Sequence, residues 1–195
     1  MNSKIKRRIQ ESILVKQQII ENKPLLNNIQ AATEIILNQI KKGNTIYFCG
    51  NGGSAADAQH LAAELSGRFY FDRPPLSADA LHCNTSFMTA VANDYSFDII
   101  YSRLLSGIGR KGDVLVGLST SGNSKNIVQA FEKAKGLGIY TIGMTGKEGG
   151  KLKGISDICL CVPSENTPRI QESHITIGHI ICEIVEDTLF EKPNE

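Results

Sequence analysis

Hydrophobic residues recur at helical spacing along the first 43 residues of the chain. One series stops before the Asn22-Lys23-Pro24 segment and consists of four isoleucines: Ile5, Ile9, Ile13 and Ile20. A second series runs over residues 25–41 and ends at Gly43, a residue type that commonly follows a helix. These series predict two helices that precede any strand. We expect both to be packing elements at a subunit interface.

Beyond Thr45 the pattern changes to short apolar runs that alternate with helical repeats. The apolar runs predict strands at 45–49, 77–81, 114–118, 140–144 and 158–162. Helical spacing predicts helices at 55–66, 85–92, 97–106, 126–135 and 168–190. Strands that alternate with helices in this way indicate a parallel sheet covered by helices on both faces.

The predicted fold class is therefore α/β, a three-layer sandwich around a five-stranded parallel sheet of flavodoxin-like order. We expect a single domain over 1–195, with N-terminal helices in 1–43 and a doubly wound core in 44–195. Ligands of such sheets bind beyond the carboxyl ends of the strands, which directs attention to the turns that follow them.

Composition excludes several classes of function. The 195 residues contain 21 Lys and Arg against 20 Asp and Glu, so neither a basic field for nucleic acid nor an acidic tail is present. No apolar run approaches the ~20 residues of a membrane span, and no apolar segment of a signal peptide follows the basic Lys4–Arg8 stretch. Five cysteines without a CxxC pair fit a cytoplasmic protein with reduced thiols. Cys159 and Cys161 alternate on a strand and are interpreted as small residues, not as a metal site.

Two turns between a strand and a helix carry polar groups suited to a sugar phosphate. Ser119-Thr120-Ser121-Gly122-Asn123-Ser124 (the phosphate turn) offers hydroxyls, backbone N–H groups and a helix N-terminus to an anion. It contains no Lys or Arg and lacks Walker A spacing, so a sugar monophosphate fits better than a nucleoside triphosphate. The second, Gly50-Asn51-Gly52-Gly53-Ser54 (the glycine turn), would contact sugar hydroxyls. The alternative is that both are ordinary helix caps and tight turns.

Two predicted helices carry residues able to transfer protons. His60 and Glu64 are four residues apart and so share one helical face. On the last helix the candidates are Gln171, His174 and His179, with Gln171 and His179 about 80° apart around the axis. A sugar chain or a metal ion could reach both. Taken singly, each of these residues is more commonly solvated or satisfied by neighbours.

The combination of motifs resembles the sedoheptulose 7-phosphate isomerases, or phosphoheptose isomerases, within the larger group of sugar-isomerase (SIS) domains. The resemblance covers nearly the whole chain, and one minor departure is Ala63, where some members carry a second Glu. The phosphate turn marks only the SIS group, whereas four residues together are specific to the heptose enzymes: His60, Glu64, Gln171 and His179. The resemblance rests on the following segments: Cys49 to Ser54, Asp57 to His60, Glu64 to Arg68, Ala92 to Asp94, Gly117 to Ser124, Thr145 to Lys147 with Gly149 and Gly150, and Arg169 to His179.

This resemblance implies conversion of D-sedoheptulose 7-phosphate to D-glycero-D-manno-heptose 7-phosphate, the entry to bacterial heptose for lipopolysaccharide or capsule. It also implies a cytoplasmic homotetramer with active sites between subunits. A zinc ion is implied at His60, Glu64, Gln171 and His179. The implied substrate contacts are Asn51, Gly52, Gly53, Glu64, Asn93, Asp94, Ser119, Thr120, Ser121, Ser124 and Gln171.

Aldose–ketose isomerisation moves a proton between neighbouring carbons through an enediol, which calls for a placed base and a placed acid. We take Glu64 as the base at C1 and His179 as the acid near O1 and O2. A carboxylate bound to zinc is a weaker base. The amide oxygen of Gln171 favours harder cations than zinc. The sequence therefore favours the acid/base pair over the zinc site. Two alternatives stay open: a non-catalytic SIS module that senses a sugar phosphate or binds a replication initiator, and an isomerase of a shorter ketose phosphate. An NAD-dependent activity is a poor fit because G-x-G-x-x-G spacing is missing.

Overall fold

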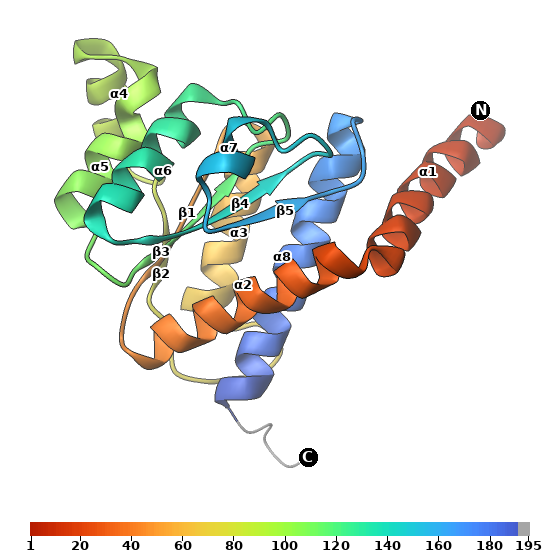
Figure 1. Cartoon of the computed structure of the whole chain (residues 1–195), viewed down its shortest axis with the longest axis horizontal. Coiled ribbons are helices and arrows are strands. Elements are labelled where there is room, and N and C mark those ends of the chain that lie inside the picture. Colours follow the sequence, from red (N-terminus) through yellow and green to blue (C-terminus); the bar gives the residue numbers. More distant parts are fainter. Residues whose placement is uncertain (191–195) are drawn as a thin grey trace.

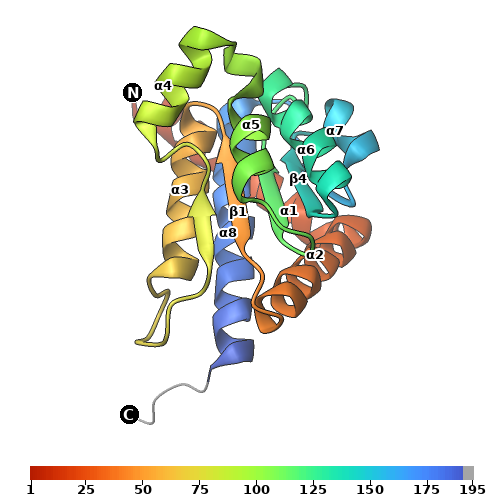
Figure 2. The same ribbon diagram turned by 90° about the vertical axis from the view of Figure 1, so that its left-hand side faces the viewer.

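A computed structural model describes residues 1–190 as three layers, with helices on both faces of one parallel sheet (Figures 1 and 2). The five strands lie in the order β2-β1-β3-β4-β5. This order confirms the predicted flavodoxin-like sheet. The strand bounds are β1 Ile46–Gly50, β2 Ala78–Ala80, β3 Val114–Leu118, β4 Tyr140–Thr145 and β5 Ile158–Cys161.

Helices begin and end close to the predicted residues. One face of the sheet carries α2 Lys23–Lys41, α3 Gly53–Ser66 and α8 Thr167–Leu189, and α1 Asn2–Glu21 packs on α2 and α8. The other face carries α4 Thr85–Asp94, the 3₁₀ turn η1 Phe97–Ile99, α5 Ile100–Ile108, α6 Lys125–Leu137 and α7 Gly150–Ile155.

The central strands are buried on both faces because each face has its own apolar core. Along β1, Ile46 and Phe48 join the core beneath α2, α3 and α8, while Tyr47 and Cys49 join the core beneath α5 and α6. Continuous apolar runs are therefore the signature of these strands, as expected for a parallel sheet with two covered faces.

The six-residue helix α7 is the one element of the core that the hydrophobic pattern did not predict. Two glycines with positive φ lie at its start, Gly149 at 77° just before it and Gly150 at 54° as its first residue, and it buries only Leu152. A helix this short shows less than two turns of periodicity, so its sequence is typical of a loop.

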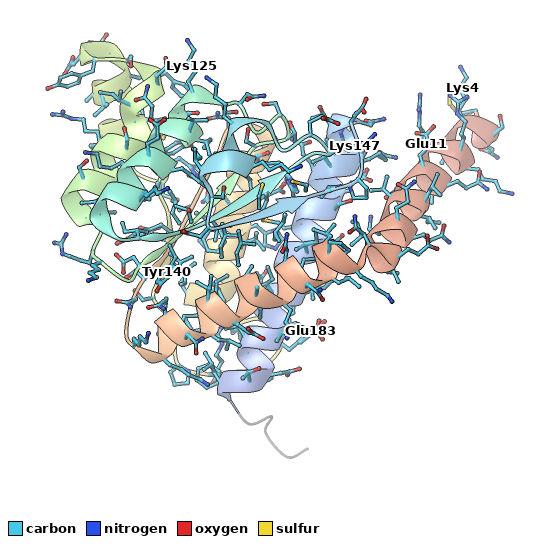
Figure 3. The ribbon with its side chains drawn as sticks, in the orientation of Figure 1. Lys4, Glu11, Lys125, Tyr140, Lys147 and Glu183 are labelled. Atoms are coloured by element: carbon cyan, nitrogen blue, oxygen red, sulfur yellow. The ribbon has the colours of Figure 1, made fainter. Side chains whose placement is uncertain are left out.

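Helix α1 extends away from the sheet, and Figure 3 shows Lys4 and Glu11 on this extended part. Its isoleucines Ile5, Ile9 and Ile13 are 50–57% exposed, and only Val15 and Ile19 of this helix are buried. The exposed isoleucines thus form an apolar face of α1 that has no partner within residues 1–190.

No helix of residues 1–190 is long and apolar enough to cross a membrane.

Candidate active site

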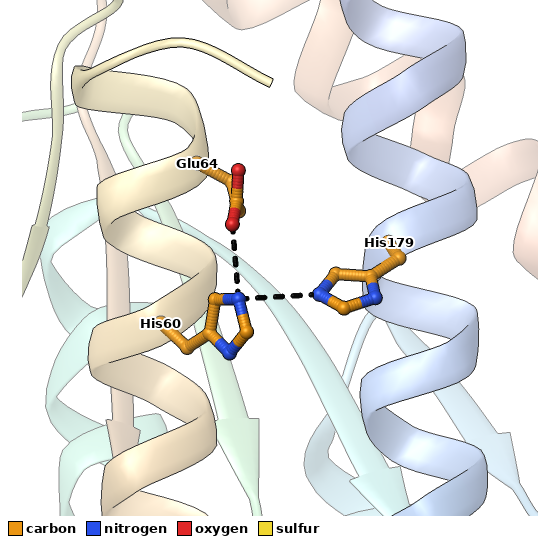
Figure 4. Close-up of side chains that lie close together, drawn as sticks. All are labelled: His60, Glu64 and His179. Atoms are coloured by element: carbon orange, nitrogen blue, oxygen red, sulfur yellow. Dashed lines mark hydrogen bonds and ion pairs between the residues drawn. The ribbon is translucent and has the colours of Figure 1, made fainter. Parts of the chain in front are cut away.

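Helices α3 and α8 lie side by side and bring three ionisable side chains together (Figure 4). His60 Nε2 lies 2.9 Å from Glu64 Oε1 and 3.4 Å from His179 Nε2. One ligand atom from each residue lies within 4.8 Å of the other two. The structure thus joins two residues that the sequence placed on one helical face with a third that lies 119 positions farther along the chain than His60.

Close packing of the two helices depends on Gly178, the residue before His179. A Cβ atom at Gly178 would lie 2.5 Å from both Cδ atoms of Leu61, the residue after His60. That separation is too short for any real carbon contact, so a side chain there would push α8 away from α3. Gly178 and Leu61 therefore set how near the two imidazoles approach.

The cluster formed by His60, Glu64 and His179 faces solvent on one side and an aromatic ring on the other. The side chain of His60 is 49% exposed and that of Glu64 is 22% exposed. The Phe69 ring packs against His179 with its centroid 5.8 Å away. A ligand can therefore reach the cluster while part of each side chain is held out of water.

Asp57 is a neighbour of this cluster that the site prediction missed. Burial raises the pKa of its carboxyl, and the His60 and His179 imidazoles act in the opposite direction. It precedes His60 by three residues, so the spacing Asp57-x-x-His60-x-x-x-Glu64 was the signal that could have found it.

The donor set of the cluster fits a zinc ion. Zinc accepts imidazole nitrogen and carboxylate oxygen at about 2.0–2.2 Å, so two ligands of one tetrahedral ion lie about 3.3–3.5 Å apart. The 3.4 Å between the Nε2 atoms of His60 and His179 falls in this range, and the 2.9 Å between His60 Nε2 and Glu64 Oε1 is shorter. Three protein ligands leave a fourth position of a tetrahedral ion for another side chain or a substrate atom.

The phosphate turn joins β3 to α6 and is held in shape by its own hydrogen bonds. Ser119 Oγ and Ser124 Oγ lie 2.9 Å apart across the turn, and the Ser119 N–H donates to the Met144 carbonyl. At Gly122 φ is 66°, and a Cβ there would lie 2.0 Å from the Gly149 carbonyl oxygen. Only glycine lets the turn pack so closely on the start of α7.

A cavity of about 330 Å³ opens beside the phosphate turn. Thr120 and Ser121 line it from the turn, and Lys147 and Gly146 line it from the loop after β4. Within residues 1–190 the Thr120 hydroxyl has no hydrogen-bond partner, so it remains available to a ligand. Two of the predicted phosphate residues, Thr120 and Ser121, therefore border a space that a ligand could enter, and Glu148 and Glu165 also line it.

A pair of amides connects the glycine turn to the first turn of α6, which follows the phosphate turn. Asn51 Nδ2 donates to Asn126 Oδ1 at 2.9 Å, and Asn126 Nδ2 donates back to Asn51 Oδ1 at 2.8 Å. Asn126 is buried at the start of α6 and was not among the predicted site residues. Asn126 lies beside Asn51 because β1 and β3 are neighbouring strands, and no local sequence pattern indicates this pairing.

The remaining predicted substrate contacts are Gln171 on α8 and the pair Asn93 and Asp94 at the end of α4. Gln171 packs over the glycine turn, where its Nε2 would lie 3.1 Å from a Cβ at Gly53. Asn93 and Asp94 are exposed at the end of α4 and hydrogen-bond to each other at 2.9 Å. In residues 1–190 neither of these two side chains bonds to the two turns, so their role as substrate contacts stays a prediction.

His174 is a core residue and does not belong to the site. Its Nε2 lies 3.1 Å from the Thr145 carbonyl oxygen, its side chain is fully buried, and its Nδ1 has no hydrogen-bond partner. Burial lowers the pKa of His174 to about 4, with the Thr145 carbonyl acting in the opposite direction. The imidazole is therefore neutral and donates through Nε2.

This burial makes a prediction about acid stability. The folded pKa of about 4 lies below the unfolded value of ~6.5, so the unfolded chain binds the proton more tightly. The contribution is complete above pH ~6.5 and is lost as pH falls toward 4, up to about 3 kcal/mol. We expect His174→Gln to flatten the pH dependence of the unfolding free energy between pH 7 and pH 4, measured by urea denaturation. A parent-like slope in the variant would contradict this account.

A buried ion pair ties the end of α3 to α8. Arg73 Nε donates to Glu186 Oε1 at 2.8 Å, and Arg73 Nη2 donates to the Glu64 carbonyl oxygen, also at 2.8 Å. Glu186 further accepts from the N–H groups of Phe69 and Tyr70. Arg73 and Glu186 thereby fix the backbone that carries Glu64 against the helix that carries His179.

Comparison with known proteins identifies the family of this chain. The family model described as "SIS domain" matches residues 9–146. The phosphoheptose isomerase of Sulfurimonas denitrificans is 50% identical over 190 residues, which cover 97% of each chain. That of Clostridium acetobutylicum is 50% identical over 196 residues and covers both chains completely. The solved structure of the Neisseria gonorrhoeae phosphoheptose isomerase superposes with a TM-score of 0.90 at 40% identity, covering 96% of this chain and 99% of that one.

Proposed function

We infer the reaction from one premise, that this chain belongs to the SIS domain family. It is an aldose–ketose isomerase that converts D-sedoheptulose 7-phosphate to D-glycero-D-manno-heptose 7-phosphate in heptose biosynthesis. The observation that carries this assignment is the meeting of Glu64 and His179 beside His60, on helices far apart in the sequence. Two relatives named as phosphoheptose isomerases share half of their residues with the chain over nearly its full length.

Glu64 and His179 are the groups that we assign to proton transfer. The Glu64 carboxylate removes the proton from C1 of the ketose, and the same group returns a proton to C2 of the enediol in the forward direction. His179 lies across the cluster and donates a proton to O2 as the enediol forms, then removes the proton from O1 as the C1 carbonyl forms. Positioned acid and base groups of this kind contribute roughly 10²–10⁴-fold each.

We assign a zinc site to His60, Glu64 and His179, with Gln171 as the fourth ligand. When bound, zinc would act as a Lewis acid that polarises the carbonyl and the adjacent hydroxyl. The ligand separations given above support the site. Elemental analysis tests it: we expect about one zinc per chain in the parent protein and loss of that zinc in His60→Asn, whereas retention of zinc by the variant would contradict the assignment.

The phosphate turn and its cavity bind the anionic end of the substrate. The hydroxyls of Ser119, Thr120, Ser121 and Ser124, together with the N-terminus of α6, supply hydrogen bonds to phosphate oxygens. The glycine turn, held to α6 by the Asn51–Asn126 pair, then lies between the phosphate and the His60–Glu64–His179 cluster and contacts the sugar hydroxyls.

Removing two hydroxyls from the phosphate turn should weaken substrate binding without touching the acid/base pair. For Ser119→Ala combined with Ser124→Ala we expect KM to rise about a hundredfold or more, because each lost hydrogen bond to a charged group costs about 1.5–3 kcal/mol. The value of kcat should change much less. Steady-state kinetics measures both, and an unchanged KM would place the phosphate elsewhere.

Steady-state kinetics with ketose phosphates of different length tests both the substrate assignment and whether the protein is a catalyst. We expect a higher kcat/KM for sedoheptulose 7-phosphate than for a six-carbon ketose phosphate. The reverse order would favour an isomerase of shorter sugars. Binding without turnover of either compound would favour a non-catalytic SIS module, a function that needs the phosphate turn but not the paired Glu64 and His179.

The apolar face of α1 supports a homotetramer. Ile5, Ile9 and Ile13 expose half or more of their surface on a helix that extends away from the sheet (Figure 1). A second copy of the chain would bury this face, and residues from neighbouring copies would complete the active sites. Sedimentation equilibrium tests the proposal, since a monomeric mass at micromolar concentration would contradict it.

A further inference from the structure

Two cysteines outside the active site form a close pair at the edge of the sheet. Cys159 and Cys161 are alternate residues of β5, and their side chains turn toward α7, where their Sγ atoms lie 3.6 Å apart. Both thiols are partly exposed. They line an opening of about 350 Å³ together with Lys153 and residues of α2.

Thr145 on the neighbouring strand β4 contacts both sulfurs. Its hydroxyl donates to Cys161 Sγ at 3.4 Å and lies 3.6 Å from Cys159 Sγ. The hydrogen bond with Cys159 lowers the pKa of the Cys161 thiol below its ordinary value, and Thr145 and Lys153 act in the same direction against burial. The same hydrogen bond and burial raise the pKa of Cys159. These effects favour the thiolate form at Cys161 over Cys159.

The pair differs from the other three cysteines of the chain. Cys49 and Cys182 are buried. Cys83 is exposed, but burial of its sulfur and the charge of Asp79 raise the pKa of its thiol. Only a thiolate is a good nucleophile, so exposure alone would favour Cys83 while charge favours Cys161.

We propose that Cys159 and Cys161 form a reactive dithiol site that a hydroperoxide oxidises to a reversible disulfide, with Cys161 as the attacking thiolate. The Cys161 sulfur attacks the terminal oxygen of the peroxide, an S–O bond forms as the O–O bond breaks, and the alkoxide leaves and takes up a proton. Cys159 then loses its proton and attacks the Cys161 sulfur. The S–S bond forms, hydroxide leaves and is protonated to water, and the two thiols have given two electrons to the peroxide.

The position of β5 at the edge of the sheet allows the disulfide between Cys159 and Cys161 to form. A disulfide needs its sulfurs about 2.04 Å apart, so the pair must approach by about 1.5 Å. The strand lies at the edge of the sheet and is paired only with β4, so it can bend on its free side. A disulfide between alternate residues of one strand is strained, and strained disulfides are the readily reduced ones.

Mass spectrometry of the full-length protein tests the site without reference to isomerase activity. Trypsin releases residues 154–169 as one peptide that contains both cysteines and no other. After treatment with hydrogen peroxide at pH 7, we expect this peptide to lose two hydrogens and to regain them with dithiothreitol. Oxidation should be on the order of tenfold faster than that of Cys83, as expected from its thiolate character.

Two variants separate the roles of the sulfurs. In Cys159→Ser the reaction should stop at a sulfenic acid on Cys161 that dimedone traps, because no second thiol resolves it. In Cys161→Ser the oxidation of Cys159 should fall to the rate of Cys83 or below. The proposal is overturned if Cys83 is oxidised first while peptide 154–169 keeps both thiols, or if Cys161→Ser leaves the oxidation rate of Cys159 unchanged.

Discussion

Replacement of Glu64 by glutamine is expected to lower kcat for sedoheptulose 7-phosphate by roughly 10²–10⁴-fold, with a smaller change in KM. The amide keeps the size of the side chain and its place beside His60, but it cannot accept the proton from C1. His179→Gln should lower kcat by a similar factor because the acid on the other helix is lost. Steady-state kinetics with the seven-carbon substrate measures both effects.

A matched control keeps this test specific. Glu132→Gln makes the same chemical change at an exposed position of α6, away from the cluster of His60, Glu64 and His179, and kcat should stay at the parent value. Circular dichroism and the urea midpoint should be alike for all three variants. Parent-like turnover by either Glu64→Gln or His179→Gln would remove that residue from the mechanism.

Arg73→Met is expected to have the largest effect on stability. The side chains of Arg73 and Glu186 are only 2% and 1% exposed, so the change leaves a carboxylate buried without its cation. Breaking a buried pair in this way costs about 3–5 kcal/mol of unfolding free energy. Urea denaturation measures the loss. The matched surface control is Arg68→Met, at the exposed position directly after Gly67, with an expected change of less than about 0.5 kcal/mol.

The double variant Arg73→Met with Glu186→Met separates stability from positioning. Apolar replacement of both partners commonly restores stability, so we expect much of the lost free energy to return. The hydrogen bond from Arg73 to the Glu64 carbonyl does not return, and kcat should stay below the parent value. A double variant with parent turnover would show that Arg73 holds the fold but not the catalytic carboxylate.

The strand pattern was readable in the sequence because both faces of the sheet are buried. Runs such as residues 114–118 are apolar throughout, and polar turn residues follow them directly. The same logic located the phosphate turn and the glycine turn at the carboxyl ends of β3 and β1. Helix α7 escaped prediction because six residues hold too little periodicity.

The site was predictable only where its residues are neighbours along one helix. The four-residue spacing placed His60 beside Glu64 without any knowledge of the fold. The approach of His179 depends on the contact of Gly178 with Leu61, and the partnership of Arg73 with Glu186 joins positions 113 residues apart. Such pairings follow from how the helices pack, so no local pattern encodes them.

The measurement that tests the central claim most directly is a crystal structure of Glu64→Gln with sedoheptulose 7-phosphate, since the inactive variant preserves the substrate. We predict phosphate density at Ser119 and Ser124, with C1 and C2 of the sugar within hydrogen-bonding reach of both residue 64 and His179. A sugar whose carbonyl end lies against other residues, out of reach of α3 or α8, would contradict the account.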